Sequence, residues 1–457
     1  MIRWLFLKGI FGVTAWILLF SPVSAGAAGN PIVWKMASLA PKNVGWAQQF
    51  QTLVVPWIRD ATDDNLRFKF YWGGVMGNDT EYLKKMRIGQ LQGAGITESG
   101  VNLACPEMSV LELPFLIKGY EEVDYLRTMM FSTFDFYFGQ HGFKMLLWID
   151  QDFDQCYSTR YQMVSLEDFR KMKFGNWGGP IETATIKALG AQPVPTNVTE
   201  AYTSLKTGLT DTAIGPAMYY AGSQLFTVIK YVNPMKIRYA PAIIVINRNN
   251  YEALPDEYQE NLDSGRDAVQ AAFVKAGRNE NARALEAMIK YGVKRAELSQ
   301  ENKAAFIKAT RPVWDQCAGQ IYPKHLLEEV LRYLDYYRAG KPVKKPLFKE
   351  TAPKGKAQAQ DTPAKPAKQQ DTRKSATSES AKESEDVQKL SAWERRKIQV
   401  RAVQEKLSAL GYYTSTVDGV FGPITQEAVM KYQSDKGFAQ SGSIDRRLLR
   451  SLDIQEQ

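Results

Sequence analysis

One long stretch of the chain cannot build a hydrophobic core, and it separates two segments that can. From Lys341 to about Asp386 the sequence is mostly Lys, Pro, Ala, Gln, Ser, Thr and Glu, with hardly an apolar side chain after Phe348. Such a segment buries too little apolar surface to offset the entropy lost on ordering. We therefore expect residues 341–390 to be a disordered linker between a large body, residues 29–340, and a small module, residues 391–457.

The predicted linker is long enough to let the two units lie far apart. As a flexible chain it spans roughly 40 Å on average, and on the order of 160 Å when fully extended. Its prolines and like charges favour the longer distances. We therefore expect it to act as a tether.

The first 28 residues have the three-part pattern of a secretory signal peptide. Arg3 and Lys8 precede an apolar run over residues 10–20, and small residues follow through Ala25 and Ala28. The apolar run is shorter than the ~20 residues needed to cross a bilayer, which disfavours a membrane anchor. Residues 1–28 are therefore predicted to be a cleavable signal peptide that sends the protein to the periplasm.

The charge distribution argues against nucleic acid as a partner. The net charge is +9, of which the signal segment carries +2, the linker +5 and the module +2. Residues 26–340 are therefore electrically balanced, so the body has no basic field to attract phosphate backbones. We expect no nucleic-acid binding.

Residues of the types that commonly form disulfides, bind metals or act in catalysis are scarce. The three cysteines, Cys105, Cys156 and Cys317, are too few for a disulfide scaffold, although one pair could bridge in an oxidising compartment. The only two histidines, His141 and His325, lie in no metal-binding or catalytic motif. The sequence thus predicts no metal, no cofactor and no enzymatic activity, and it favours binding over catalysis.

The body reads as mixed α/β. Short apolar runs at residues 32–37, 67–72 and 242–247 are typical of strands. Residues 256–291 are Ala-rich and almost free of breakers and predict one long helix, and residues 323–337 predict another with a leucine-rich stripe.

The module is predicted to contain three short helices. Val400, Val403, Leu407 and Leu410 form one apolar face that stops at Gly411. A second helix is expected over residues 425–432, with Thr425 as its N-cap, and a third around residues 448–452. A unit this small can fold alone but is marginal.

The module resembles the peptidoglycan-binding domain type 1 family. The resemblance rests on Leu410-Gly411-Tyr412-Tyr413 and on the run Asp418-Gly419-Val420-Phe421-Gly422-Pro423 followed by Thr425. It implies a three-helix fold that binds peptidoglycan and so associates the protein with the cell wall. Glycine and aspartate also suit the turns of such a fold. Within the motif we select Tyr412, Tyr413, Asp418 and Phe421 as candidate peptidoglycan contacts.

The body resembles the solute receptors of TRAP (tripartite ATP-independent periplasmic) transporters, of the dicarboxylate-receptor DctP type. Short runs match in order along some three hundred residues: 40–41, 45–46, 71–79, 88–91, 113–115, 165–173, 200–211 and 254–255. The resemblance implies two hinge-connected α/β lobes that close over one ligand, with long helices crossing both. It also implies TRAP permease subunits in the membrane as partners.

Three polar anchors that the resemblance leads one to expect are missing. At the position of the family's arginine, which pairs with a substrate carboxylate through two hydrogen bonds, this chain has Gly175. Residues 148–157 also lack a second arginine that is often found there. The polar Gln-Glu-Asn run is replaced by Ala213-Ile214-Gly215. An anion buried without partners would be costly. We therefore expect a variant receptor without the arginine clamp, for a neutral or hydrophobic ligand. A cationic ligand is expected instead if Glu98 or the acidic residues between Asp150 and Asp154 face it.

The candidate ligand-binding residues are those near the family's pocket segments. Pockets are commonly apolar with a few orienting polar groups, and we select Trp46, Trp72, Glu98, Phe153, Asn176, Trp177, Ile214, Gly215 and Tyr219. Tyr220 is a further aromatic candidate.

Two other functions remain open. One is a conventional organic-acid receptor that takes its arginine from elsewhere, such as Arg160 or Arg238. The other is a wall-modifying or otherwise wall-associated protein that does not transport. By analogy with receptors of hydrophobic ligands, a periplasmic tetratricopeptide-repeat protein is a possible further partner.

Overall fold

The computed structural model describes two parts of the chain. They comprise residues 31–177 and 179–340, and residues 392–417, 419, 423–438, 444 and 446–454. The expected signal peptide and linker, and the candidate contacts Asp418 and Phe421, lie outside the described residues. No described helix combines the length and the apolar character needed to cross a membrane.

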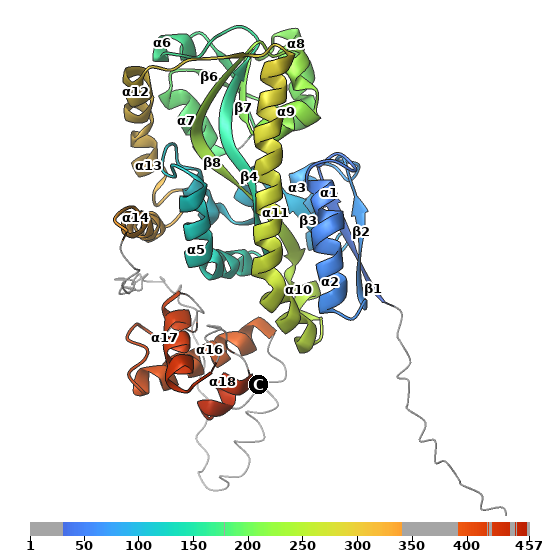
Figure 1. Ribbon diagram of the computed structural model, residues 1–457, viewed down its shortest axis with the longest axis vertical. Helices are drawn as coiled ribbons and strands as arrows, with labels where there is room; N and C mark the ends of the chain where they lie inside the picture. Colours follow the sequence, from blue (N-terminus) through green and yellow to red (C-terminus); the bar gives the residue numbers. More distant parts are fainter. Residues whose placement is uncertain are drawn as a thin grey trace, which may run out of the picture.

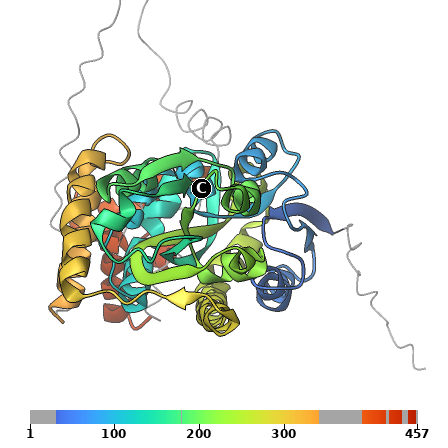
Figure 2. The ribbon, with the colours of Figure 1, turned by 90° about the horizontal axis from the view of Figure 1, so that it is seen from above.

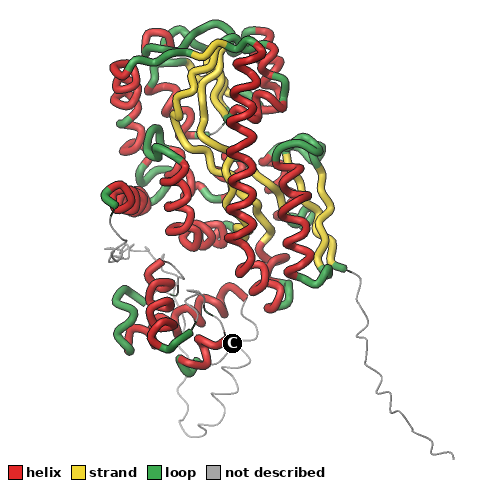
Figure 3. Tube along the Cα trace, viewed as in Figure 1, coloured by secondary structure: helices red, strands yellow, loops and turns green. Residues whose placement is uncertain are grey.

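The body is built on one mixed sheet flanked by helices (Figures 1 and 3). Nine strands of the described residues take part, in the order β2-β1-β3-β8-β4-β7-β5-β6, with β9 paired to β8. Their bounds are β1 (Ile32–Ser38), β2 (Leu66–Tyr71), β3 (Gly93–Ile96), β4 (Phe143–Ser158), β5 (Lys173–Asn176), β6 (Gln192–Pro195), β7 (Thr212–Gly215), β8 (Tyr231–Asn247) and β9 (Lys294–Arg295).

Two long strands, β4 and β8, connect the two ends of the sheet. They pair antiparallel from Phe143↔Asn247 to Ser158↔Tyr231, with register shifts at three places. We call them the connecting strands. The parallel strands β1–β3 and the helices around them form the first lobe, and β5–β7 with their helices form the second.

Helices cover the sheet on both sides. Those of the first lobe are α1 (Trp46–Gln49), the π-helix η1 (Phe50–Val54), α2 (Val55–Ala61), α3 (Asp79–Arg87), α4 (Glu98–Ala104), the 3₁₀ helix η2 (Pro106–Glu112) and α5 (Tyr120–Gln140). Those of the second lobe are α6 (Leu166–Phe169), α7 (Pro180–Ala188), η3 (Val198–Glu200), α8 (Ala201–Thr207), α9 (Ala217–Gly222) and η4 (Leu225–Thr227).

The last helices of the body are α10 (Arg248–Glu252), α11 (Asp256–Tyr291), α12 (Gln300–Thr310), α13 (Pro312–Cys317) and α14 (Lys324–Arg338). Figures 1 and 2 show α12, α13 and α14 gathered along one side of the body. The mixed α/β fold predicted from the sequence is confirmed, with β8 much longer than the apolar run that signalled it.

Helix α11 runs alongside both lobes (Figure 1). It begins after Pro255, with Asp256 and Glu257 in its first turn where carboxylates complement the helix dipole, and it ends at Gly292, whose φ is 125°. The near absence of breakers predicted its bounds correctly, although Gly265 and Gly277 lie within it. Because it packs on both α2 and α9, this helix links the lobes independently of the connecting strands.

The three cysteines are all free and buried. Cys105 and Cys317 pack in the core of the first lobe, and Cys156 packs among second-lobe residues. The disulfide that the sequence left open is therefore not formed.

The C-terminal module contains α16 (Ala392–Ala409), α17 (Pro423–Asp435) and α18 (Arg446–Ser451). Val403, Leu407, Val429 and Leu448 are among the residues of its core. Leu410, expected to face inward, is 55% exposed. Thr425 is not an N-cap either, because α17 begins at Pro423 and the Thr425 hydroxyl accepts a bond from Gln404.

Candidate functional site

The junction of the two lobes is occupied by one buried arginine surrounded by four carboxylates. The guanidinium of Arg238, on β8, bonds to Glu98 at the start of α4, to Glu112 at 3.1 Å and to Glu182 at 2.6 Å. Its Nε lies 2.8 Å from a carboxylate oxygen of Asp154 on β4. We call these five residues the Arg238 cluster. Glu98 and Glu112 belong to the first lobe and Glu182 to the second, so the cluster joins both lobes to the connecting strands.

Burial makes the excess of carboxylates in this cluster costly. The Arg238 side chain is 1% exposed and none of the four carboxylate side chains exceeds 6%. Burial raises the pKa of Glu98 to about 7 and that of Asp154 to about 7, although the charge of Arg238 opposes both shifts. Burial, with the nearby charge of Glu98, also raises the pKa of Glu112 well above its ordinary value. The cluster therefore holds protons near neutral pH.

An aromatic ring fills the space beside the predicted ligand site in the second lobe. A Cβ placed on Gly175 would lie 3.1 Å from the indole nitrogen of Trp177, and one placed on Gly215 would lie 3.8 Å from the same ring. The Trp177 ring packs edge-on against Tyr219, with ring centroids 5.4 Å apart. The absence of a side chain at Gly175 gives Trp177 this room, and that at Gly215 gives room to Tyr220, whose ring a Cβ there would approach to 3.1 Å.

Backbone and side-chain bonds tie Trp177 across the junction. The Ser99 hydroxyl of α4 donates to the Trp177 carbonyl at 2.8 Å, and the Trp177 amide donates to Glu182 at 2.8 Å. Through Glu182, the Trp177 backbone is coupled to the Arg238 cluster. Asn176 donates to Thr183 at 2.6 Å, while its side-chain carbonyl is buried without a partner in the described part of the chain.

The remaining candidates lie in different environments. Trp46 and Trp72 belong to a first-lobe aromatic cluster, where Trp72 stacks on Phe70 at 4.4 Å. The indole N–H of Trp46 is buried with no partner among the described residues. Ile214 is 3% exposed and packs in the second-lobe core, so it is not free to line a cavity. Phe153 does line a cavity, but a different one.

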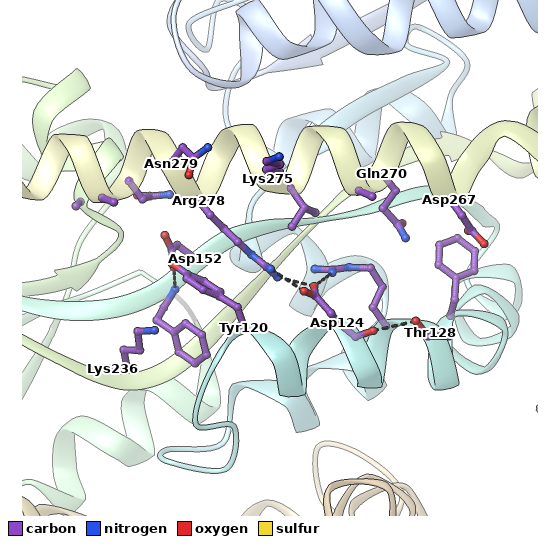
Figure 4. A pocket seen from close by; sticks show the side chains of 18 of the residues that line it. Tyr120, Asp124, Thr128, Asp152, Lys236, Asp267, Gln270, Lys275, Arg278 and Asn279 are labelled. Carbon is purple, nitrogen blue, oxygen red and sulfur yellow. Dashed lines mark hydrogen bonds and ion pairs between the residues drawn. The ribbon is translucent and has the colours of Figure 1, made fainter. Parts of the chain in front are cut away.

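That cavity, of about 970 Å³, lies between α5 and α11 over the connecting strands. Figure 4 shows α11 along one side of it and α5 along the other. We call it the α5–α11 groove. Gln155, Ala217 and Asn281 line its second-lobe end, and Thr128 and Arg266 lie toward the first lobe. No local pattern of the sequence predicts it, because its two helical walls, α5 and α11, come from segments more than one hundred residues apart.

Ion pairs cross the groove at its centre. Arg278 of α11 donates to both carboxylate oxygens of Asp124 on α5, at 2.7 and 2.8 Å (Figure 4). It also donates to Asp150 at 2.7 Å. Arg127 donates to the same two carboxylates. Burial alone would raise the pKa of Asp124, but the bonds from Arg278 and the charge of Arg127 hold it below its ordinary value. These charges neutralise one another.

The candidate peptidoglycan contacts that are described differ in accessibility. Tyr412 is half-buried and packs edge-on against Tyr432, with ring centroids 5.2 Å apart. Tyr413 is 3% exposed; its hydroxyl donates to the Thr416 carbonyl at 2.8 Å and accepts a bond from Gln404. Tyr413 therefore supports the fold, whereas Tyr412 presents part of its ring to solvent.

No group of three or more His, Cys, Asp or Glu side chains in the described ranges is arranged to hold a metal ion. In the Arg238 cluster the four carboxylates surround a guanidinium.

Comparison with known proteins places both parts of the chain. The model of bacterial extracellular solute-binding protein family 7 (DctP) matches residues 42–320, and that of the peptidoglycan-binding domain type 1 matches residues 396–452. The 2,3-diketo-L-gulonate-binding periplasmic protein of Escherichia coli is 23% identical over 215 residues, 45% of this chain and 63% of that protein. The ectoine-binding periplasmic protein of Halomonas elongata is 21% identical over 221 residues, 47% of this chain and 63% of that protein. The matches thus span less than two thirds of either relative.

Solved structures share the fold of the body. The sugar acid binding protein of Advenella mimigardefordensis, in complex with galactonate, superposes with a TM-score of 0.63 at 20% identity, covering 67% of this chain and 98% of that one. A TRAP periplasmic solute-binding protein of Desulfovibrio salexigens with bound orotic acid gives a TM-score of 0.63 at 19% identity, covering 67% and 99%. With a family model matched over more than half its length, this chain belongs to bacterial extracellular solute-binding protein family 7, and it carries a peptidoglycan-binding domain type 1 at its C-terminal end.

Proposed function

We propose that this protein is a periplasmic, non-enzymatic receptor that binds one neutral or hydrophobic solute between its two lobes and presents it to a TRAP-type permease. Membership of the solute-binding family supports the receptor role, and the matched C-terminal domain supports attachment to peptidoglycan. The ligand class rests on the Trp177 ring, which lies against Gly175, the position where the resemblance places a carboxylate-binding arginine.

The charges at the lobe junction support the same ligand class. Arg238 is the arginine that could replace the missing clamp, but four carboxylates already surround it. Arg160, the other candidate, is exposed. An anionic ligand would thus meet an excess of negative charge without a free arginine. The buried N–H of Trp46 and the carbonyl of Asn176 supply a donor and an acceptor for a polar group of a neutral ligand.

The relatives' ligands do not by themselves predict that of this chain. The relatives are described as binding a diketo sugar acid, galactonate, orotic acid and ectoine. At about 20% identity the fold is shared, but a shared fold does not fix the ligand.

The first experiment identifies the ligand and its site. Native mass spectrometry of the protein from its own periplasm should release a solute without a carboxylate, and calorimetry should show no binding of galactonate or orotate. W177A should weaken binding of that solute by at least about tenfold, since a large aromatic contact is lost. Y202A, which removes a 37% exposed tyrosine on α8, is the matched control and should bind normally. Micromolar binding of an organic acid that survives W177A would establish the conventional receptor instead.

The second experiment addresses the wall. We expect the full-length protein to sediment with purified peptidoglycan sacculi, and a variant lacking residues 391–457 to stay in solution. Equal sedimentation of the two would refute tethering by the module. A fall in turbidity of the sacculi on adding the protein would show a wall-modifying activity and refute the non-enzymatic assignment.

A further inference from the structure

The α5–α11 groove has the properties of a binding site separate from the lobe junction. Its volume of about 970 Å³ is within the range of small-molecule sites. None of the Arg238 cluster lines it, and of the candidate ligand-binding residues only Phe153 does, so the connecting strands separate the two places.

The groove carries a surplus of positive charge. Its lining includes five cationic side chains and three carboxylates: Arg127, Lys236, Arg266, Lys275 and Arg278 against Asp124, Asp152 and Asp267. The three arginines are paired, Arg266 with Asp263 and Asp267, and the other two with Asp124 and Asp150. Lys236 and Lys275 are exposed, and among the described residues no carboxylate lies within ion-pair distance of either. These two ammonium groups are available to an anion.

An aromatic surface is held in place between the cations. The Tyr120 ring has the Lys236 ammonium 4.3 Å from its centroid and the Arg278 guanidinium also 4.3 Å from it. The Tyr120 hydroxyl donates to Asp152 at 2.6 Å, which fixes the ring (Figure 4). Lys236 also lies 4.7 Å from the centroid of Phe153. Farther along the groove the Phe131 ring is covered by the Arg266 guanidinium, 4.1 Å from its centroid.

A backbone irregularity directs Asp152 into this arrangement. Asp152 has φ 130°, which a residue with a side chain rarely adopts, and the β4–β8 register shifts between Asp150 and Asp152. Bulges of this kind re-aim side chains and are frequent beside functional sites. Here the irregularity places the carboxylate where it orients Tyr120.

We propose that the α5–α11 groove is a second ligand site, which binds a small organic anion with a flat apolar portion. The anionic group is bound by Lys236 and Lys275, and the apolar portion lies along the half-buried Tyr120 ring. Because the groove is bounded by α5, α11 and the connecting strands, an occupant contacts the elements that join the two lobes. This proposal does not depend on the ligand proposed for the lobe junction.

Calorimetry on the full exported chain at low ionic strength tests the site, with naphthalene-2-carboxylate as probe. We expect saturable binding of the carboxylate and none of the uncharged naphthalene-2-carboxamide, which has the same shape. K236Q/K275Q should weaken binding by at least about tenfold, since both unpaired cations are lost. The matched control K187Q/K308Q removes two exposed lysines of α7 and α12 and should bind as the unaltered protein does.

Each other outcome overturns the proposal. Failure of the carboxylate to bind, or equal binding of the amide, excludes an anion site. Unchanged binding by K236Q/K275Q, with circular dichroism showing that this variant is folded, places the probe elsewhere. The W177A variant separates the two sites: it should keep its affinity for the probe, and a loss there would place the probe at the lobe junction.

Discussion

The two faces of the connecting strands show how differently one pair of strands can use charge. On one face Asp154 and Arg238 belong to a buried cluster in which four carboxylates surround one cation. On the other, Phe153 and Lys236 face a groove with more cations than carboxylates. Because successive side chains of a strand point to opposite faces, residues 153 and 154 can serve the two environments. Asp152 would share the face of Asp154, but the irregular backbone turns it toward the groove.

The largest expected effect comes from removing one arginine from each face, Arg238 from the cluster and Arg278 from the groove. R238M leaves four buried carboxylates without their cation, and we expect a loss of about 3–5 kcal/mol in the free energy of unfolding at pH 7. R278M should cost only about 1 kcal/mol, because Asp124 is half exposed and Arg127 remains bonded to Asp150. Urea unfolding of the two variants measures both. A cost for R278M equal to that of R238M would contradict the distinction between the faces.

The second prediction concerns pH, with opposite signs for Glu98 of the Arg238 cluster and Asp124 of the groove. Burial raises the pKa of Glu98 from 4.5 to about 7, so the folded protein holds a proton that the unfolded chain releases. The stability this proton provides is complete below pH 4.5, falls as the pH rises toward 7 and is absent above it. Asp124, whose pKa is lowered, contributes stability above its ordinary pKa of 3.8 that is lost on acidification.

Unfolding free energies between pH 2 and 8 therefore separate these two carboxylates. E98Q keeps the hydrogen-bonding shape without the titrating proton, and we expect it to remove a decline of about 2 kcal/mol between pH 4.5 and 7. D124N should leave that decline intact and reduce only the loss of stability below pH 4. An E98Q profile as steep as that of the unaltered protein would show that Glu98 does not hold the proton.

Sequence reasoning predicted what depends on local pattern. The segment over residues 256–291 is almost free of breakers and ends at a glycine, and the structure has α11 with the same bounds. The alternation of strands and helices gave the fold class. The prediction that Leu410 faces inward was wrong, because Leu410 comes after the last residue of α16 and the periodicity of the helix no longer places its side chain.

The Arg238 cluster could not be found in this way. Its members, at positions 98, 112, 154, 182 and 238, come from five different elements, and no local spacing relates them. The sequence did identify Glu98, and Arg238 as a possible anion partner, but not that they bond to each other. Tryptophan shows the converse difficulty: the same residue type serves core and pocket, so no local pattern assigns Trp46 or Trp72 to one of them.

The smallest predicted effect concerns Asp152, whose irregular backbone departs from the alternation of side chains along β4. Y120F keeps the ring between Lys236 and Arg278 but removes the hydroxyl that donates to Asp152. Burial raises the pKa of Asp152 to about 6, and the Tyr120 bond is the largest opposing contribution, so its loss should move that pKa higher still. Carbon-13 NMR titration of the Asp152 carboxyl measures the shift, with Y125F on the same helix as control. The expected cost in stability is about 1 kcal/mol or less. A fall in the Asp152 pKa would mean that this hydroxyl does not stabilise the carboxylate, and that the bulge at Asp152 has another cause.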